Sequence, residues 1–151
     1  MAAVDYFLKL EGIDGESKDS KHKDEIEIQS WSWGESNTVS QIDGGGGGAG
    51  KVQFQDFHFT SLISKASPAL FRSCATGEHI KEATLTARKS GGGQQDFLHI
   101  KMTDVLISSY QSGGANSDAL PTDQFSLNFA KVDYDFAGFS TGFDVRGNKI
   151  T

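Results

Sequence analysis

The 151-residue chain has a single cysteine, Cys74, so it cannot form an internal disulfide. Residues 1–5 lack the basic region and apolar run of a secretory leader. No segment approaches the roughly 18 uninterrupted apolar residues that a membrane-spanning helix needs. We therefore expect a protein that folds in a reducing cytoplasm, inserts into no membrane, and is exported only by dedicated machinery.

Basic residues are also scarce. There are 14 of them against 20 acidic residues, which gives a formal net charge of −6. Because this charge opposes a phosphate backbone instead of neutralising it, the composition predicts that the protein does not bind nucleic acid.

The residues that are present suffice for one folded domain. Leu, Ile, Val and Phe together exceed the roughly one-fifth of a chain below which proteins tend to stay disordered, and Phe alone occurs 11 times. The length fits a single domain over residues 1–151. The 18 glycines occur largely in runs, which indicates loops and turns between short strands.

Two-residue alternation of apolar side chains predicts strands along most of the chain. The expected strands cover residues 6–10, 26–33, 51–60, 83–87, 98–102, 124–136 and 139–145, with residues 105–110 continuing or starting another. Ile26 and Ile28 share one face of the second strand, but Trp31 and Trp33 fall on the other, which favours a bulge near residues 29–30. A run of glycines at residues 91–93 predicts a hairpin turn.

One short helix is expected over residues 68–76. Ser67 offers a capping hydroxyl, Pro68 suits the first helical position, and Gly77 suits the left-handed conformation that ends a helix. Four apolar residues at helical spacing form one stripe, which consists of Leu70, Phe71, Cys74 and Ala75. We expect this stripe in the core, with Cys74 as a buried and inert thiol. About eight strands and one helix favour a closed or nearly closed antiparallel barrel, because closure removes exposed edges.

Motifs that could support catalysis are incomplete. Residues 45–51 resemble a phosphate-binding loop, but Val52 supplies no hydroxyl for magnesium and a strand follows instead of a helix. Residues 138–142 match the nucleophile-elbow pattern around Ser140, yet no histidine follows them. The four histidines lack metal-ligand spacing and are expected at the surface or in the sheet: His22, His58, His79 and His99. The sequence therefore predicts no catalytic residues, no metal and no cofactor.

Several segments, in order, are similar to the haemolysin-coregulated protein (Hcp) family of the type VI secretion apparatus. They are GESKD at residues 15–19, His22, EIEI at 25–28, WSWG at 31–34, the glycine-rich run at 44–51, GEH at 77–79, ARK at 87–89 and SLNFAK at 126–131. The resemblance implies a mainly β fold, a two-sheet antiparallel barrel of about eight strands with one short flanking α-helix.

The resemblance also implies a structural function and a set of partners. Members of the family form homohexameric rings that stack into a tube. The tube lies inside a contractile sheath, is capped by a spike of the valine-glycine repeat protein G type, and is expelled into the medium or a target cell, sometimes with small effectors in the lumen. The competing interpretations are a small-ligand-binding barrel without ring assembly and a hydrolase of modest β architecture.

Two loops rich in small residues are candidate assembly contacts. A ring-stacking contact is expected at Gly44, Gly45, Gly46, Gly47, Gly48 and Lys51. A lumen or second interface loop is expected at Gln111, Ser112, Gly113 and Gly114. Trp31 and Trp33 suit either core packing or a contact between copies.

Overall fold

The computed structural model describes residues 4–39, 49–91, 93–117 and 119–151. Its elements, in chain order, are β1 (Val4–Leu10), β2 (Ile26–Ile28), β3 (Ser30–Ser32), β4 (Glu35–Val39), β5 (Ala49–Phe54), β6 (Phe57–Leu62), α1 (Ala66–Thr76), β7 (Ile80–Lys89), β8 (Asp96–Gly113), β9 (Thr122–Phe136), β10 (Phe139–Asp144) and β11 (Lys149–Ile150). All described strand pairs are antiparallel. The prediction of a mainly β fold with one short helix is confirmed.

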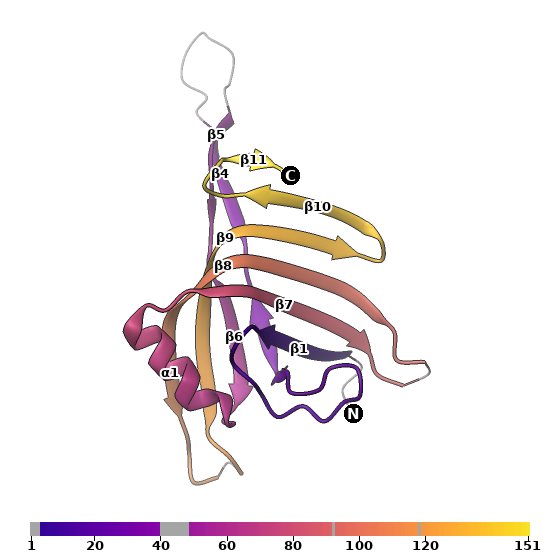
Figure 1. Cartoon of the computed structure of the whole chain (residues 1–151), viewed down its shortest axis with the longest axis vertical. Helices are drawn as coiled ribbons and strands as arrows, with labels where there is room; N and C mark the ends of the chain where they lie inside the picture. The colour runs from indigo at the N-terminus through magenta and orange to yellow at the C-terminus, as the bar shows by residue number, and fades with distance from the viewer. Residues whose placement is uncertain (1–3, 40–48, 92, 118) are drawn as a thin grey trace.

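One nine-stranded sheet forms most of the molecule (Figure 1). Its strands follow the order β11-β10-β9-β8-β7-β1-β2, while β6 pairs with β9 and β3 pairs with β6. The long strand β9 makes this possible, because its first half lies beside β6 and its second half beside β10. Strands β4 and β5 form a separate two-stranded ribbon.

The expected barrel is not closed by an unbroken ladder of strands. β2 pairs with β1, and β3 pairs with β6 on the other side of the gap. The chain itself crosses between them at Gln29, whose backbone N–H donates to the carbonyl of Thr60 at 2.8 Å. The change of face predicted near residues 29–30 therefore arises because the strand changes partner.

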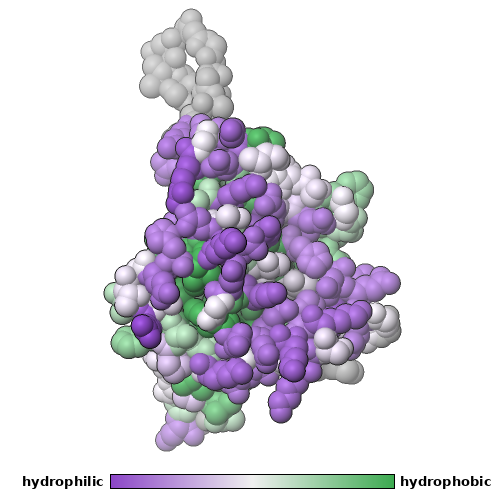
Figure 2. Space-filling view, in the orientation of Figure 1, coloured by the Kyte–Doolittle hydropathy of each residue, from purple (hydrophilic) through white to green (hydrophobic). Residues whose placement is uncertain are grey.

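The core lies on the inner side of this curved sheet, where its strands face one another. It is formed by buried aliphatic and aromatic residues of every long strand and of α1, including Leu8, Ile26, Phe57, Phe59, Leu70, Leu85, Ile100, Met102, Phe125 and Leu127. The surface in view in Figure 2 is largely hydrophilic with scattered apolar residues. Within the described residues, no helix has the length and apolar character to cross a membrane.

Helix α1 begins two residues earlier than predicted. Its N-cap is Lys65 and not Ser67, because Ser67 turns inward and donates to the buried carboxylate of Asp123. The predicted C-terminal end is confirmed, since Gly77 adopts the left-handed conformation with φ 70°. The predicted core stripe is wrong in part: Leu70 is buried, whereas Phe71 is 61% exposed.

One strand prediction also needs correction. The expected strand at residues 51–60 is two strands, β5 and β6, separated at Gln55 and Asp56. Asp56 is held there by Ser108, whose hydroxyl donates at 2.6 Å, and by the Asn128 amide at 2.9 Å. Residues 105–110 continue one 18-residue strand, β8. The predicted hairpin is confirmed, since β7 and β8 pair on either side of Gly91 and Gly93, which have φ angles of 84° and 95°.

Candidate assembly surfaces

The two loops predicted as contacts have different outcomes. Gly44, Gly45, Gly46, Gly47 and Gly48 lie outside the described residues, so their contact role stays a prediction. Lys51 lies in β5 with an exposed side chain.

The predicted loop at Gln111, Ser112, Gly113 and Gly114 is largely a strand. Gln111 pairs with Gln124, Ser112 with Asp123, and Gly113 with Thr122, so β8 and β9 extend their ladder to Gly113. The alternation of apolar residues stops near Tyr110 because the residues of β8 beyond that point are exposed on both faces of the strand. A small depression of about 170 Å³ is lined by this end of the hairpin.

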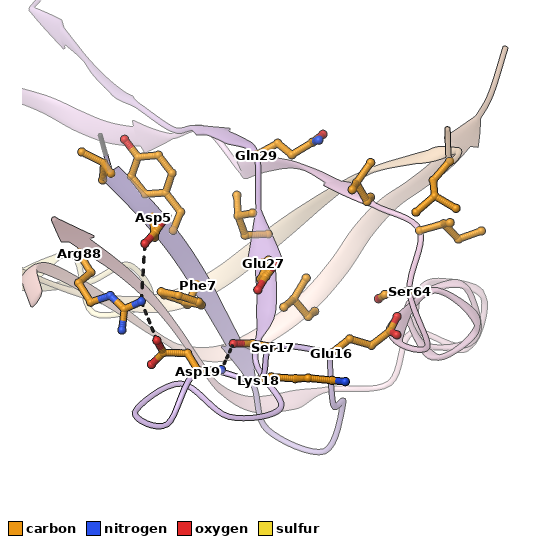
Figure 3. Close-up of a pocket in the computed structure, with 17 residues that line it drawn as sticks. Asp5, Phe7, Glu16, Ser17, Lys18, Asp19, Glu27, Gln29, Ser64 and Arg88 are labelled. Atoms are coloured by element: carbon orange, nitrogen blue, oxygen red, sulfur yellow. Dashed lines mark hydrogen bonds and ion pairs between the residues drawn. The ribbon is translucent and has the colours of Figure 1, made fainter. Parts of the chain in front are cut away.

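A larger groove of about 860 Å³ lies over the outer face of β1 and β2. One wall is the segment that contains Glu16, Lys18 and Asp19, and the other wall contains Leu62 and Leu120. Figure 3 shows Glu27 on β2 between these walls, with Asp5, Phe7 and Arg88 at one end of the groove.

A buried cation closes that end of the groove. The Arg88 side chain is almost fully buried, its Nη2 lies 2.7 Å from Asp19 and 3.6 Å from Asp5, and its guanidinium carbon lies 4.9 Å from the centre of the Phe7 ring. The other two guanidinium nitrogens, Nε and Nη1, have no hydrogen-bond partner in the structure as described. The positive charge is therefore compensated by carboxylates on one side and by an aromatic face on the other.

The pKa values of this pair reflect the contact. The hydrogen bond from Arg88 holds the pKa of the Asp19 carboxyl well below its usual range, and the backbone N–H of Lys21 lowers it further. The same hydrogen bond raises the pKa of Arg88 above its ordinary value, against the effect of burial. Both groups are charged across the physiological range.

His22 continues the cluster on the far side of Phe7. The two rings stack with centroids 4.5 Å apart and planes 8° apart. Nδ1 lies 3.1 Å from Glu25, and Nε2 lies 3.2 Å from Asp96. The expectation of a surface or sheet histidine is wrong for His22, which is buried in the segment between β1 and β2.

Sequence reasoning missed this cluster. The mixed charges of residues 17–25 are typical of a solvated loop, and the spacing of Asp19 and Arg88 along the chain gives no sign that they meet. The available signal was the place of Asp5, Phe7 and Arg88 in their strands: Asp5 faces Arg88 across the β1–β7 ladder, and Phe7 lies on the face opposite to Leu8. A large apolar residue such as Phe7 on the outer face of a strand indicates that another segment of the chain covers that face.

A second buried polar network fixes α1 to the sheet. The Asp123 carboxylate is 1% exposed and accepts hydrogen bonds from Ser67 and, at 2.8 Å, from the hydroxyl of Tyr110. Burial and the nearby carboxylate raise the pKa of Tyr110. This network is structural, because its acceptor oxygens are each occupied by a group of the same chain.

The C-terminal turn has its own ion pairs at the surface. Asp104 contacts Arg146 and lies 2.7 Å from Nδ1 of His79, and the hydrogen bond with His79 lowers the pKa of Asp104, with Arg146 adding to the effect. These contacts tie the turn after β10 to β8 and to the segment after α1.

The candidate nucleophiles Ser140 and Cys74 both lie within regular secondary structure. Ser140 lies within β10, opposite Asp135, so the strand-turn-helix geometry of a nucleophile elbow is absent there. Cys74 is half-buried on α1. No group of three or more possible metal ligands occurs among the described residues.

Comparison with known proteins gives the family. The family described as type VI secretion system effector, Hcp, matches residues 7–136. The chain belongs to this Hcp family. The protein hcp1 of Pseudomonas aeruginosa is 46% identical over 135 residues, which cover 89% of this chain and 83% of that protein. The resemblance inferred from the ordered segments is confirmed.

Solved Hcp structures share the fold. Hcp1 of Salmonella typhimurium matches with a TM-score of 0.87 and 34% identity, over 99% of this chain and 100% of that chain. A structure titled as a type six secretion system protein matches with a TM-score of 0.92 and 26% identity, over the same shares of both chains. The Hcp fold therefore accounts for nearly the whole chain.

The two tryptophans of the Hcp chain are half-buried against the core. Trp33 stacks on Phe57 with ring centroids 4.7 Å apart and also packs against Phe54 and Phe129. Trp31 meets Tyr6 edge to face at 5.9 Å. Of the two alternatives for these residues, core packing accounts for most of their surface.

Proposed function

We propose that this chain is a structural tube subunit of a type VI secretion system. Six copies form a ring, rings stack into a tube, and the tube is expelled from the bacterial cytoplasm into the medium or a target cell. The partners are other copies, a spike protein of the valine-glycine repeat G type, the contractile sheath, and small effectors carried in the lumen.

The observation that carries this proposal is the extent of the match with Hcp proteins. The family match covers residues 7–136, and the structural match covers 99% of the chain. The absence of a nucleophile elbow around Ser140 agrees with a non-enzymatic subunit. A ring requires a heterologous contact, in which two different surfaces of each copy meet.

Electron microscopy and light scattering of the purified protein test the proposal. We expect negative-stain images with six-fold rings, and a mass in solution of six times the 16.3 kDa chain. A monomer at all concentrations tested, with no rings on the grid, would contradict it.

Small-ligand binding is the alternative function. The volume of the groove falls within the range of ligand pockets, roughly 300 to 1,000 Å³. However, the groove lies on the outer face of β1 and β2 with two exposed leucines in its wall, and the barrel interior is filled by core side chains. This arrangement favours a contact surface over a pocket that encloses a ligand.

A further inference from the structure

The groove over β1 and β2 carries uncompensated negative charge. Its carboxylates are Asp5, Glu16, Asp19 and Glu27, and its cations are Lys18 and Arg88. The charge of Arg88 is already compensated by ion pairs with Asp19 and Asp5. Glu27 is exposed on β2 and has no ion-pair partner within the described part of the chain.

The same groove offers an apolar wall. Leu62, Ile63 and Leu120 are all exposed, although they are large aliphatic residues. They lie together because the N–H of Ile63 donates to the carbonyl of Pro121 at 3.0 Å. The groove therefore suits a segment that combines a cation with an apolar side chain.

The floor of the groove is also a strand edge. The carbonyl of Glu25 accepts from the N–H of Ser17, and the N–H of Gln29 donates to Thr60, both on the side of the strand away from β1. Backbone groups of alternate residues point to the same side of a strand. The N–H and carbonyl of Glu27 therefore point into the groove, in the gap between Ser17 and Thr60.

The C-terminal end of the chain has the complementary character. Residues 146–151 contain two cations, Arg146 and Lys149, and no acidic side chain. Arg146 is paired with Asp104, whereas Lys149 has no ion-pair partner among the residues that the structure describes. Ile150, its neighbour, is 69% exposed, and β11 is the terminal strand of the nine-stranded sheet.

These two surfaces lie at different ends of the molecule. Figure 1 shows β11 at the same end as β5, and β1 toward the other end. A contact between β11 and the groove therefore cannot form within one copy, and repeating it between copies builds a head-to-tail assembly.

We propose that β11 of one copy lies in the groove of a copy in the next ring. Lys149 pairs with Glu27, Ile150 packs on the wall formed by Leu62, Ile63 and Leu120, and β11 adds to the exposed edge of β2. This contact rests on the proposed stacking of rings and names the surfaces that produce it.

Charge reversal tests the contact with preformed rings. Lys149→Glu and Glu27→Lys each place like charges in the interface, so each variant should form normal rings that stack at least about tenfold more weakly than wild type. Both residues are exposed, so neither variant should melt at a different temperature from wild type. Sedimentation velocity and negative-stain microscopy at low salt measure the fraction of rings in tubes.

Mixing the two variants gives the decisive result. A Lys149→Glu ring has an acidic β11 that suits the basic groove of a Glu27→Lys ring, and its unchanged groove suits the unchanged β11 of that ring. Two populations of rings that do not stack alone should therefore form tubes when mixed. The controls are Lys81→Glu and Glu78→Lys, which change the net charge equally at exposed positions outside both surfaces.

Several results would overturn the contact. Normal stacking of the single variants would show that Lys149 and Glu27 do not meet. Failure of the mixed rings to stack, or rescue only when the two chains are refolded together into one ring, would exclude a contact between rings. If the wild-type protein made no rings, the proposed function would fail and the contact with it, whereas wild-type tubes with unaffected variants would remove only the contact.

Discussion

At the scale of single residues, the stability of the segment between β1 and β2 depends on a buried ion pair. Arg88 is 3% exposed, and Asp19 is its nearest carboxylate. Breaking a buried pair from one side leaves an uncompensated charge, which costs about 3–5 kcal/mol in other proteins. Asp5, at 3.6 Å, and the ring of Phe7 offset part of that cost here.

We predict that Asp19→Asn lowers the free energy of unfolding by roughly 2–4 kcal/mol at pH 7, because the Arg88 charge loses its closest partner. Urea denaturation measures the change. Asp14→Asn is the matched control, since Asp14 is an exposed carboxylate in the same segment. Equal stabilities for the two variants would show that the pair contributes nothing.

The same pair predicts how stability depends on pH. Because the folded-state pKa of Asp19 lies below its unfolded value, its contribution is fully present above the ordinary carboxyl pKa of about 4 and is lost as the pH falls further. Between pH 4 and pH 2, the stability of wild type should therefore fall more steeply than that of Asp19→Asn. Parallel pH profiles from thermal denaturation would contradict this.

Gly15, in the segment between β1 and β2, lies too close to the backbone of Glu25 for any side chain to fit. A Cβ atom at Gly15 would lie 2.5 Å from the carbonyl oxygen of Glu25, a backbone atom that cannot move aside alone. We predict that Gly15→Ala destabilises the fold by about 1–3 kcal/mol or more. Gly113→Ala is the control, since a Cβ there meets nothing within 4 Å. Differential scanning calorimetry should separate the two variants clearly.

At the scale of elements, α1 is fixed to the barrel by one buried leucine and one buried polar network. We predict that Leu70→Ala lowers the free energy of unfolding by roughly 2–5 kcal/mol, as loss of a buried leucine does. Phe71→Ala should stay within about 0.5 kcal/mol of wild type, because that ring is mostly exposed. Urea titration of both variants tests this, and similar losses would place Phe71 in the core.

The existence of most elements could be predicted, but the ends of several strands could not. Alternation of apolar residues fails as a signal where a strand is exposed on both faces, as in the last residues of β8. It also fails where one run of sequence serves two partners. Gln29 and Asp56 mark such points, and their roles depend on Thr60, Ser108 and Asn128, which lie far away in sequence.

At the scale of the whole molecule, the order of strands was not accessible from sequence. β9 pairs with three different strands because it is 15 residues long and changes its neighbour midway. The groove follows from this topology. Because β6 pairs with β3 and not with β2, the edge of β2 at Glu27 stays open. The family, in contrast, could be recognised from several short motifs in the same order along the chain. Such motifs are specific to a family even where the sequence does not reveal their structural roles.

The glycine-rich run at residues 44–48 is the remaining candidate for contacts between rings. Long segments without side chains can lie close against another backbone. Shortening this run changes no described strand and removes no apolar side chain, and loop length contributes only about 0.6 kcal/mol per doubling. The shortened variant should therefore keep the melting temperature of wild type and form rings.

We predict that these rings no longer assemble into tubes under conditions in which wild-type rings do. Sedimentation and electron microscopy of the two proteins side by side provide the measurement, and Lys51→Ala tests the charged residue that follows the run. Normal tubes from the shortened variant would assign stacking to other surfaces. In that case the contact between β11 and the groove should be sufficient, and Lys149→Glu in the shortened background should abolish the tubes that remain.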